Sequence, residues 1–99
     1  MALHCPATLL VGLPRVVEQL HDPGLVTGYG PFVGAEVDVV SELEALADLH
    51  RGERVVVPVD EVALREVAEM VGPRRAAGAG DVLHVEIGDD GWVLAPGLP

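Results

Sequence analysis

The sequence contains no lysine, and its only basic residues are six arginines. They stand against 16 acidic residues, so the formal net charge is -10. Proteins that bind phosphate backbones or anionic membrane surfaces need clustered Lys and Arg side chains. The only adjacent basic pair is Arg74-Arg75, and we therefore expect no nucleic acid and no membrane as a partner.

The chain has a single cysteine, Cys5, which excludes an internal disulfide. This favours a reducing compartment, and we expect a cytoplasmic location. His4 lies beside Cys5, but a metal site needs further ligands, and His21, His50 and His84 stand far apart in the sequence. We therefore expect no metal and no cofactor.

Aromatic residues make up only 3% of the chain, whereas hydrophobic residues make up 49%. The core must therefore consist mainly of Val, Leu and Ala side chains. No apolar run approaches the roughly 20 residues that a membrane-spanning helix needs. The length of 99 residues predicts a single α/β domain over residues 1–99, with loose termini at 1–6 and 96–99.

Apolar residues follow two kinds of spacing along the chain. Continuous apolar runs and alternation predict strands, and apolar residues three and four apart predict helices. The predicted strands are residues 8–13, 55–59, 81–87 and 92–95, and the predicted helices are residues 15–21, 35–50 and 61–71. This order predicts an α/β fold, a small sandwich with a mostly parallel sheet, helices packed on it, and a C-terminal antiparallel β-hairpin.

Residues 22–34 contain four glycines and two prolines. We predict an irregular loop there, with Tyr29 and Phe32 packed on the core. No Gly-Lys-Ser/Thr follows these glycines, as a phosphate-binding loop requires, and no strand directly precedes them, as a dinucleotide site requires.

The stretch from Arg51 to Asp60 is typical of a buried strand that runs into the helix at 61–71. In open α/β folds, ligands gather at the carboxyl ends of parallel strands. Asp60 and Glu61 stand at this junction, and a pocket that raised one pKa would allow acid/base chemistry. The favoured roles are simpler: a helix N-cap for Asp60 and an acid facing the helix dipole for Glu61.

Three segments resemble the histidine phosphatase superfamily, the phosphoglycerate mutase-like enzymes. The segment His4-Cys-Pro-Ala-Thr-Leu-Leu-Val11 is similar to the opening strand of the family. The segment Leu49-His-Arg-Gly-Glu-Arg-Val-Val-Val57, with the helix before it, resembles the second strand, and the hairpin from Asp81 to Leu94 resembles the closing strands. The resemblance implies that the first two of these strands lie side by side.

The family's catalytic residues are absent from the matching positions. Its first strand ends in Arg-His-Gly, whose histidine takes the phosphoryl group, and these positions are Leu13, Pro14 and Arg15 here. Proline offers no nucleophile. The second family histidine falls on Asp60, and the two carboxylates of Asp60 and Glu61 would oppose phosphate binding by about 1 to 4 kcal/mol at contact distance. The family's long middle section is also missing.

We therefore expect a non-catalytic, histidine phosphatase-like domain with a degenerate active site, acting in binding or assembly. One alternative is a residual phosphatase or mutase-like hydrolase that uses pocket candidates Arg15, Asp60, Glu61 and His84. Another is an unrelated small regulatory α/β module. Loss of the middle section would uncover a Val-rich surface, and this predicts a homodimer or a protein partner. The sequence does not identify a small-molecule ligand.

Overall fold

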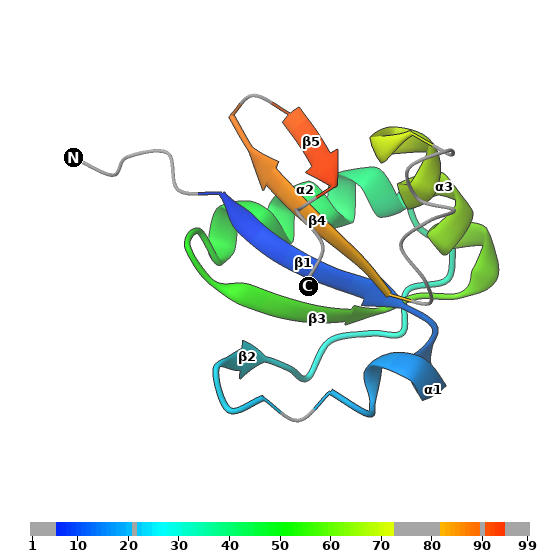
Figure 1. The fold of residues 1–99 in the computed structure, drawn as a ribbon. Helices are drawn as coiled ribbons and strands as arrows, with labels where there is room; N and C mark the ends of the chain where they lie inside the picture. Colours follow the sequence, from blue (N-terminus) through cyan, green and yellow to red (C-terminus); the bar gives the residue numbers. More distant parts are fainter. Residues whose placement is uncertain (1–5, 21, 73–81, 90, 95–99) are drawn as a thin grey trace.

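The computed structural model describes residues 6–20, 22–72, 82–89 and 91–94. These residues form one five-stranded sheet with the order β2-β3-β1-β4-β5 (Figure 1). The strands are β1 (Ala7–Gly12), β2 (Leu25–Val26), β3 (Arg54–Pro58), β4 (Val82–Gly88) and β5 (Gly91–Leu94), and the helices are α1 (Pro14–Val17), α2 (Val39–Leu49) and α3 (Glu61–Val71).

The sheet is parallel on one side and antiparallel on the other. Strands β1 and β3 are parallel neighbours, in a register that runs from Thr8 opposite Arg54 to Gly12 opposite Pro58. The short strand β2 is parallel to β3. Strand β4 runs antiparallel to β1 and forms a hairpin with β5. The predicted α/β fold, with its mostly parallel sheet and C-terminal hairpin, is confirmed.

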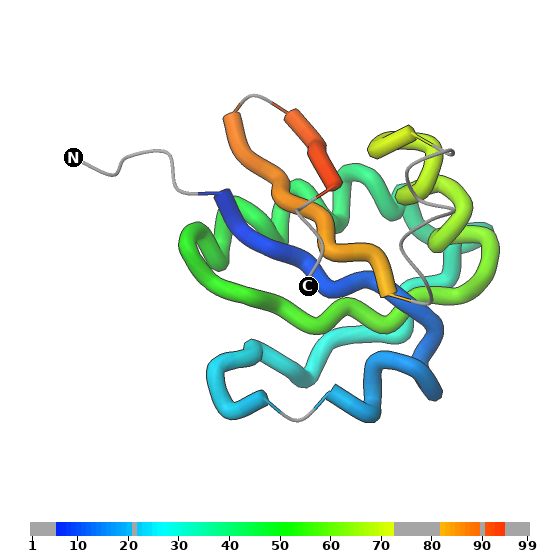
Figure 2. The backbone as a smooth tube through the Cα atoms, in the orientation of Figure 1, coloured from blue at the N-terminus to red at the C-terminus, as the bar shows by residue number. Residues whose placement is uncertain are grey.

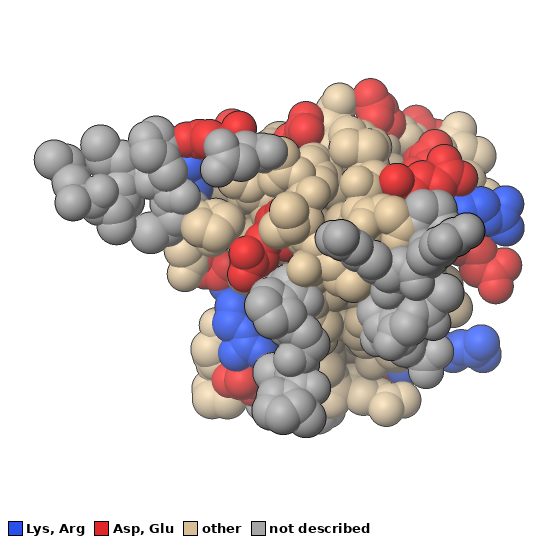
Figure 3. Space-filling view, turned by 45° about the horizontal axis from the view of Figure 1, so that its top comes forward, with Lys and Arg blue, Asp and Glu red and all other residues tan. Residues whose placement is uncertain are grey.

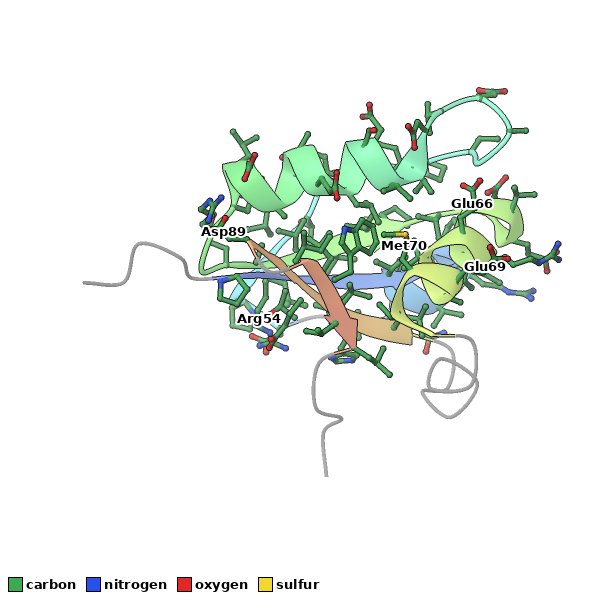
Figure 4. The ribbon with its side chains drawn as sticks, turned by 90° about the horizontal axis from the view of Figure 1, so that it is seen from above. Arg54, Glu66, Glu69, Met70 and Asp89 are labelled. Carbon is green, nitrogen blue, oxygen red and sulfur yellow. The ribbon has the colours of Figure 1, made fainter. Side chains whose placement is uncertain are left out.

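The helices cover the two faces of the sheet unequally. Figure 4 shows α2 and α3 on one side of the sheet, whereas Arg54 of β3 lies on the other side. The main core lies under α2 and α3, and a smaller cluster under α1 contains Leu10, Val17 and Val56. The buried strand residues of the main core are Ala7, Leu9, Val11, Val55, Val57, Leu83, Val85 and Ile87. Alternate residues along each strand therefore point to opposite faces, as the pleat of a sheet requires.

The two long helices bury the apolar stripes that their spacing predicts. Helix α2 buries Val39, Leu43, Leu46 and Ala47, and α3 buries Ala63, Val67 and Val71. Helix α2 begins at residue 39 and not at residue 35. The Asp38 carboxylate accepts a hydrogen bond from the backbone N–H of Ser41, at 3.4 Å, and so caps the helix there.

Polar contacts fasten the β4–β5 hairpin to α2. The Arg51 guanidinium, just after α2, donates to Asp48 at 2.9 Å and to Asp89 of the hairpin turn at 3.2 Å. The Trp92 indole N–H of β5 donates to the Glu44 carboxylate of α2 at 3.0 Å. The two hydrogen bonds of Arg51, to Asp89 and to Asp48, raise its pKa because they stabilise the charged guanidinium.

Two predictions for the segment between β1 and α2 were wrong. The predicted helix at 15–21 is a single turn, α1, and residues 25 and 26 of the predicted loop form β2. Figure 2 shows how the chain returns from α1 along the outer edge of β3. A strand of two residues is too short to show alternation, and it forms here because β3 offers a parallel edge. Phe32 and Tyr29 pack against the main core, as predicted.

Some predictions fall on parts of the chain that lie outside the described residues. These are the positions of His4, Cys5 and His21, the linker after α3, and the ends of the chain.

Candidate functional site

The segments that follow β1, β2 and β3 meet at one edge of the sheet. The Val59 N–H donates to the Gly12 carbonyl at 2.9 Å, and the Phe32 N–H donates to the Pro58 carbonyl at 3.0 Å. The Asp60 N–H in turn donates to the Phe32 carbonyl at 3.0 Å. Because these three strands are parallel, their carboxyl ends lie together, which is where ligands bind in open α/β sheets.

A pocket of about 350 Å³ opens beside this edge, on the face of the sheet that carries α1. We call it the carboxyl-edge pocket. Its apolar lining residues are Pro14, Val17, Leu20, Pro31, Val56 and Pro58. Thr27, Gly28 and Tyr29 form part of its wall, and Glu18 is the only charged residue in the lining as far as the structure describes the chain. A mainly apolar wall with a few polar groups is typical of sites for small molecules.

Glu18 follows the last residue of α1 and is exposed. Within the described part of the chain, its carboxylate makes no ion pair. None of the arginines that the structure describes lines the pocket. The pocket therefore carries one uncompensated negative charge at an apolar wall.

Tyr29 connects the pocket wall to the end of α2. Its hydroxyl lies 2.7 Å from the Nε2 atom of His50, and the Nδ1 atom of His50 lies 2.9 Å from the Glu53 carboxylate. Because Nδ1 faces a carboxylate, it carries the proton of the neutral ring, and Nε2 accepts a hydrogen bond from the Tyr29 hydroxyl. The two rings also meet edge to face, with centroids 5.6 Å apart.

Asp60 caps α3, as predicted. Its Oδ1 atom accepts hydrogen bonds from the backbone N–H groups of Ala63, at 2.9 Å, and Gly34, at 3.0 Å. These bonds hold the pKa of Asp60 below its usual value, because both stabilise the charged carboxylate. Glu61 is exposed in the first turn of α3, where an acid faces the positive end of the helix dipole.

The structure does not gather the predicted candidates around the carboxyl-edge pocket. Arg15, Asp60, Glu61 and His84 are all absent from its lining. Arg15 is exposed on α1. His84 lies on β4 opposite Leu10 of β1, on the other side of β1 from β3.

His84 and Arg54 share the α1 face of the sheet. The pKa of His84 is lowered, first by partial burial and then by the positive charge of Arg54. Arg54 itself pairs with Asp22 at 3.2 Å. Among the described residues, no hydroxyl or thiol group forms a hydrogen bond with His84. This group of side chains therefore does not form an activated nucleophile.

Sequence reasoning missed the pocket residues between Leu20 and Pro31. Their one signal was the Gly- and Pro-rich composition, which marks a loop but not its function. In the described part of the chain, no three His, Cys, Asp or Glu side chains are grouped so that they could hold a metal ion. Also among the described residues, no helix has the length and apolar character needed to cross a membrane.

Comparisons of the chain with models of known protein families, with curated proteins and with solved structures found no match. The kinship with histidine phosphatases thus stays a prediction that rests on the segments quoted above.

Proposed function

We propose that this protein is a non-catalytic binding module whose ligand occupies the carboxyl-edge pocket. The observation that carries the proposal is the position of this 350 Å³ pocket beside the carboxyl ends of β1 and β3. Its volume falls within the range of about 300 to 1,000 Å³ that is usual for small-molecule sites. Most of its lining side chains are apolar, which favours binding by burial of apolar ligand surface.

The chemistry of the lining residues argues against catalysis. Among the described residues, the lining contains no histidine, cysteine, arginine or lysine. A phosphoryl group carries negative charge, and enzymes that transfer it stabilise that charge with cations. Here Glu18 is the one charged lining residue in the described part of the chain, and the Asp60 carboxylate is already engaged as a helix cap. A residual phosphatase is therefore the weaker candidate.

Descent from a histidine phosphatase framework remains part of this proposal. It is supported by the parallel pairing of β1 with β3, which that descent requires. The hydrogen bond from Val59 N–H to the Gly12 carbonyl brings the strand ends before Pro14 and Asp60 together, and these are the positions of the family's two histidines. In this proposal the chain keeps the strand arrangement of the family, and mainly apolar residues stand where the family has its catalytic site.

Two measurements test the proposed function. The first is hydrolysis of p-nitrophenyl phosphate, for which we expect no turnover. The second is an NMR titration of the ¹⁵N-labelled protein with 2-phenylethanol as an uncharged probe. We expect the amide signals of Val17, Thr27 and Gly28 to shift, because these residues lie at the pocket.

A pair of variants controls the titration. Thr27→Trp places a large side chain at an exposed position in the pocket wall and should abolish binding. Ala45→Trp makes the same kind of change at an exposed position on α2, away from the pocket, and should leave binding unchanged. Turnover that disappears in Asp60→Ala, or an absence of probe binding at millimolar concentration, would overturn the proposal.

A further inference from the structure

We infer that the carboxyl-edge pocket selects a ligand with an apolar body and a cationic amine head over neutral or anionic molecules of the same shape. This inference rests on the proposed function and names the chemical class of its ligand. It depends on the negative charge of Glu18 in the lining, and on the absence of any described arginine from that lining.

The first observation is the unpaired carboxylate of Glu18. Among the described residues it is the only formal charge in the lining, and no ion pair with another of these residues neutralises it. Arg54, on the same face of the sheet, already pairs with Asp22. Arg15 belongs to the same short helix but is absent from the lining. An ammonium group on a bound ligand would therefore meet a free carboxylate.

The second observation is the composition of the rest of the wall. The side chains of Val17, Leu20 and Val56 offer apolar surface for the body of a ligand. Thr27, Gly28 and Tyr29 complete the wall, whereas the Tyr29 ring packs against the main core and meets His50. An apolar floor beside one carboxylate is a suitable environment for an amine with an apolar substituent.

The third observation is the charge of the whole molecule. The net charge of -10 gives the protein a negative field, which attracts cations and repels anions at low ionic strength. Figure 3 shows acidic side chains over several parts of one face of the molecule, with basic side chains in a few separate places. An anionic ligand would therefore face both this field and the Glu18 carboxylate.

The test compares three probes of similar size: 2-phenylethylamine, 2-phenylethanol and 3-phenylpropanoate. Their dissociation constants are measured by NMR titration at low salt. We expect the amine to bind about 1.5- to 5-fold more tightly than the alcohol, as is usual for an exposed charge pair, and the carboxylate to bind more weakly than the alcohol. Added NaCl should reduce the difference between amine and alcohol, because it screens the charges.

Two variants locate the effect. Glu18→Gln should remove the preference for the amine over the alcohol, so that the two dissociation constants become similar. Glu42→Gln changes the net charge equally at an exposed position on α2 and should keep the preference. An amine that binds no better than the alcohol, or a preference that survives in Glu18→Gln, would overturn this inference while the binding module stands. Failure of all three probes to bind would overturn the proposed function itself.

Discussion

The Asp60 carboxylate joins two segments that are distant in the sequence. Its Oδ1 atom accepts from the N–H of Ala63 in the first turn of α3 and from the N–H of Gly34, which precedes α2. Asp60→Ala removes both bonds and should lower the Tm by roughly 4 to 8 °C, the shift expected for loss of a cap in a domain of this size. Asp60→Asn should lower the Tm by a smaller amount, because asparagine is also a good N-cap.

The charge of Asp60 also gives stability a defined pH dependence. The folded protein holds the pKa of this carboxyl below the unfolded value of about 3.9, because two N–H groups bind its charged form. Its contribution is therefore complete above pH 4 or so and is lost as the pH falls through the lower, folded pKa. Thermal melts across this acidic range should show the wild type losing stability more steeply than Asp60→Asn. Parallel curves would contradict this assignment.

Gly34 lies where a side chain would collide with α3. A Cβ atom there would lie 2.6 Å from the Ala63 backbone nitrogen and 3.0 Å from the Val62 carbonyl carbon. Both are backbone atoms, so the start of α3 would have to move. We expect Gly34→Ala to cost about 1 to 3 kcal/mol in urea unfolding, as overpacking usually does.

Gly24→Ala is the matched control, because the nearest atom to its Cβ is the Asp22 carboxylate at 3.4 Å. Its effect on the free energy of unfolding should be small. Equal losses in the two variants would show that the close approach at Gly34 has no special role.

At the scale of elements, the bond from Tyr29 to His50 attaches the segment after β2 to the end of α2. Tyr29→Phe removes this hydrogen bond and should cost about 0.5 to 1.5 kcal/mol. Hydrogen exchange of the amides from Thr27 to Phe32 should become faster than in the wild type, whereas β1 should be less affected.

A double-mutant cycle tests whether the two residues act together. His50→Phe keeps an aromatic ring and removes the acceptor of the Tyr29 hydroxyl. If the bond joins the two elements, the double variant should lose less stability than the sum of the single variants. Additive losses would mean that the 2.7 Å contact contributes nothing to the attachment.

At the scale of the whole molecule, the sheet ends in two edge strands, β2 and β5. Among the described residues, the exposed large apolar side chains are Val37 before α2, Leu49 at the end of α2, Val62 and Met70 on α3, and Val93 on β5. On the α1 face, β4 carries Val82, which packs on the smaller cluster, followed by the polar side chains of His84 and Glu86. The homodimer expected from the sequence stays a prediction, and β5 is the edge where we now expect it to form.

Light scattering coupled to size-exclusion chromatography tests this expectation. At micromolar concentration we expect a mass above that of a single chain, increasing with NaCl, because the charge of -10 opposes association. Val93→Lys, at a side chain that is 52% exposed on β5, should restore the monomer. A clean monomer of the wild type at all salt concentrations would contradict the prediction.

Local physics explains which parts of the fold were predictable from the sequence. The apolar run before Gly12 and the valines before Pro58 predict buried strands whatever lies beside them. The spacing of apolar residues predicts α2 and α3, and Asp60 before Glu61 predicts the cap. Each of these signals depends on neighbours within a few residues, and the structure contains all of them.

The sequence by itself therefore determined the α/β class, the long helices, the main strands and the role of Asp60. Only the tertiary structure decided that residues 25 and 26 pair with β3, that Tyr29 meets His50 across 21 positions, and that a pocket opens beside α1. It also decided that His84 lies on the far side of β1 from β3. The reason is that these features depend on contacts between distant segments, which no spacing within one segment can encode.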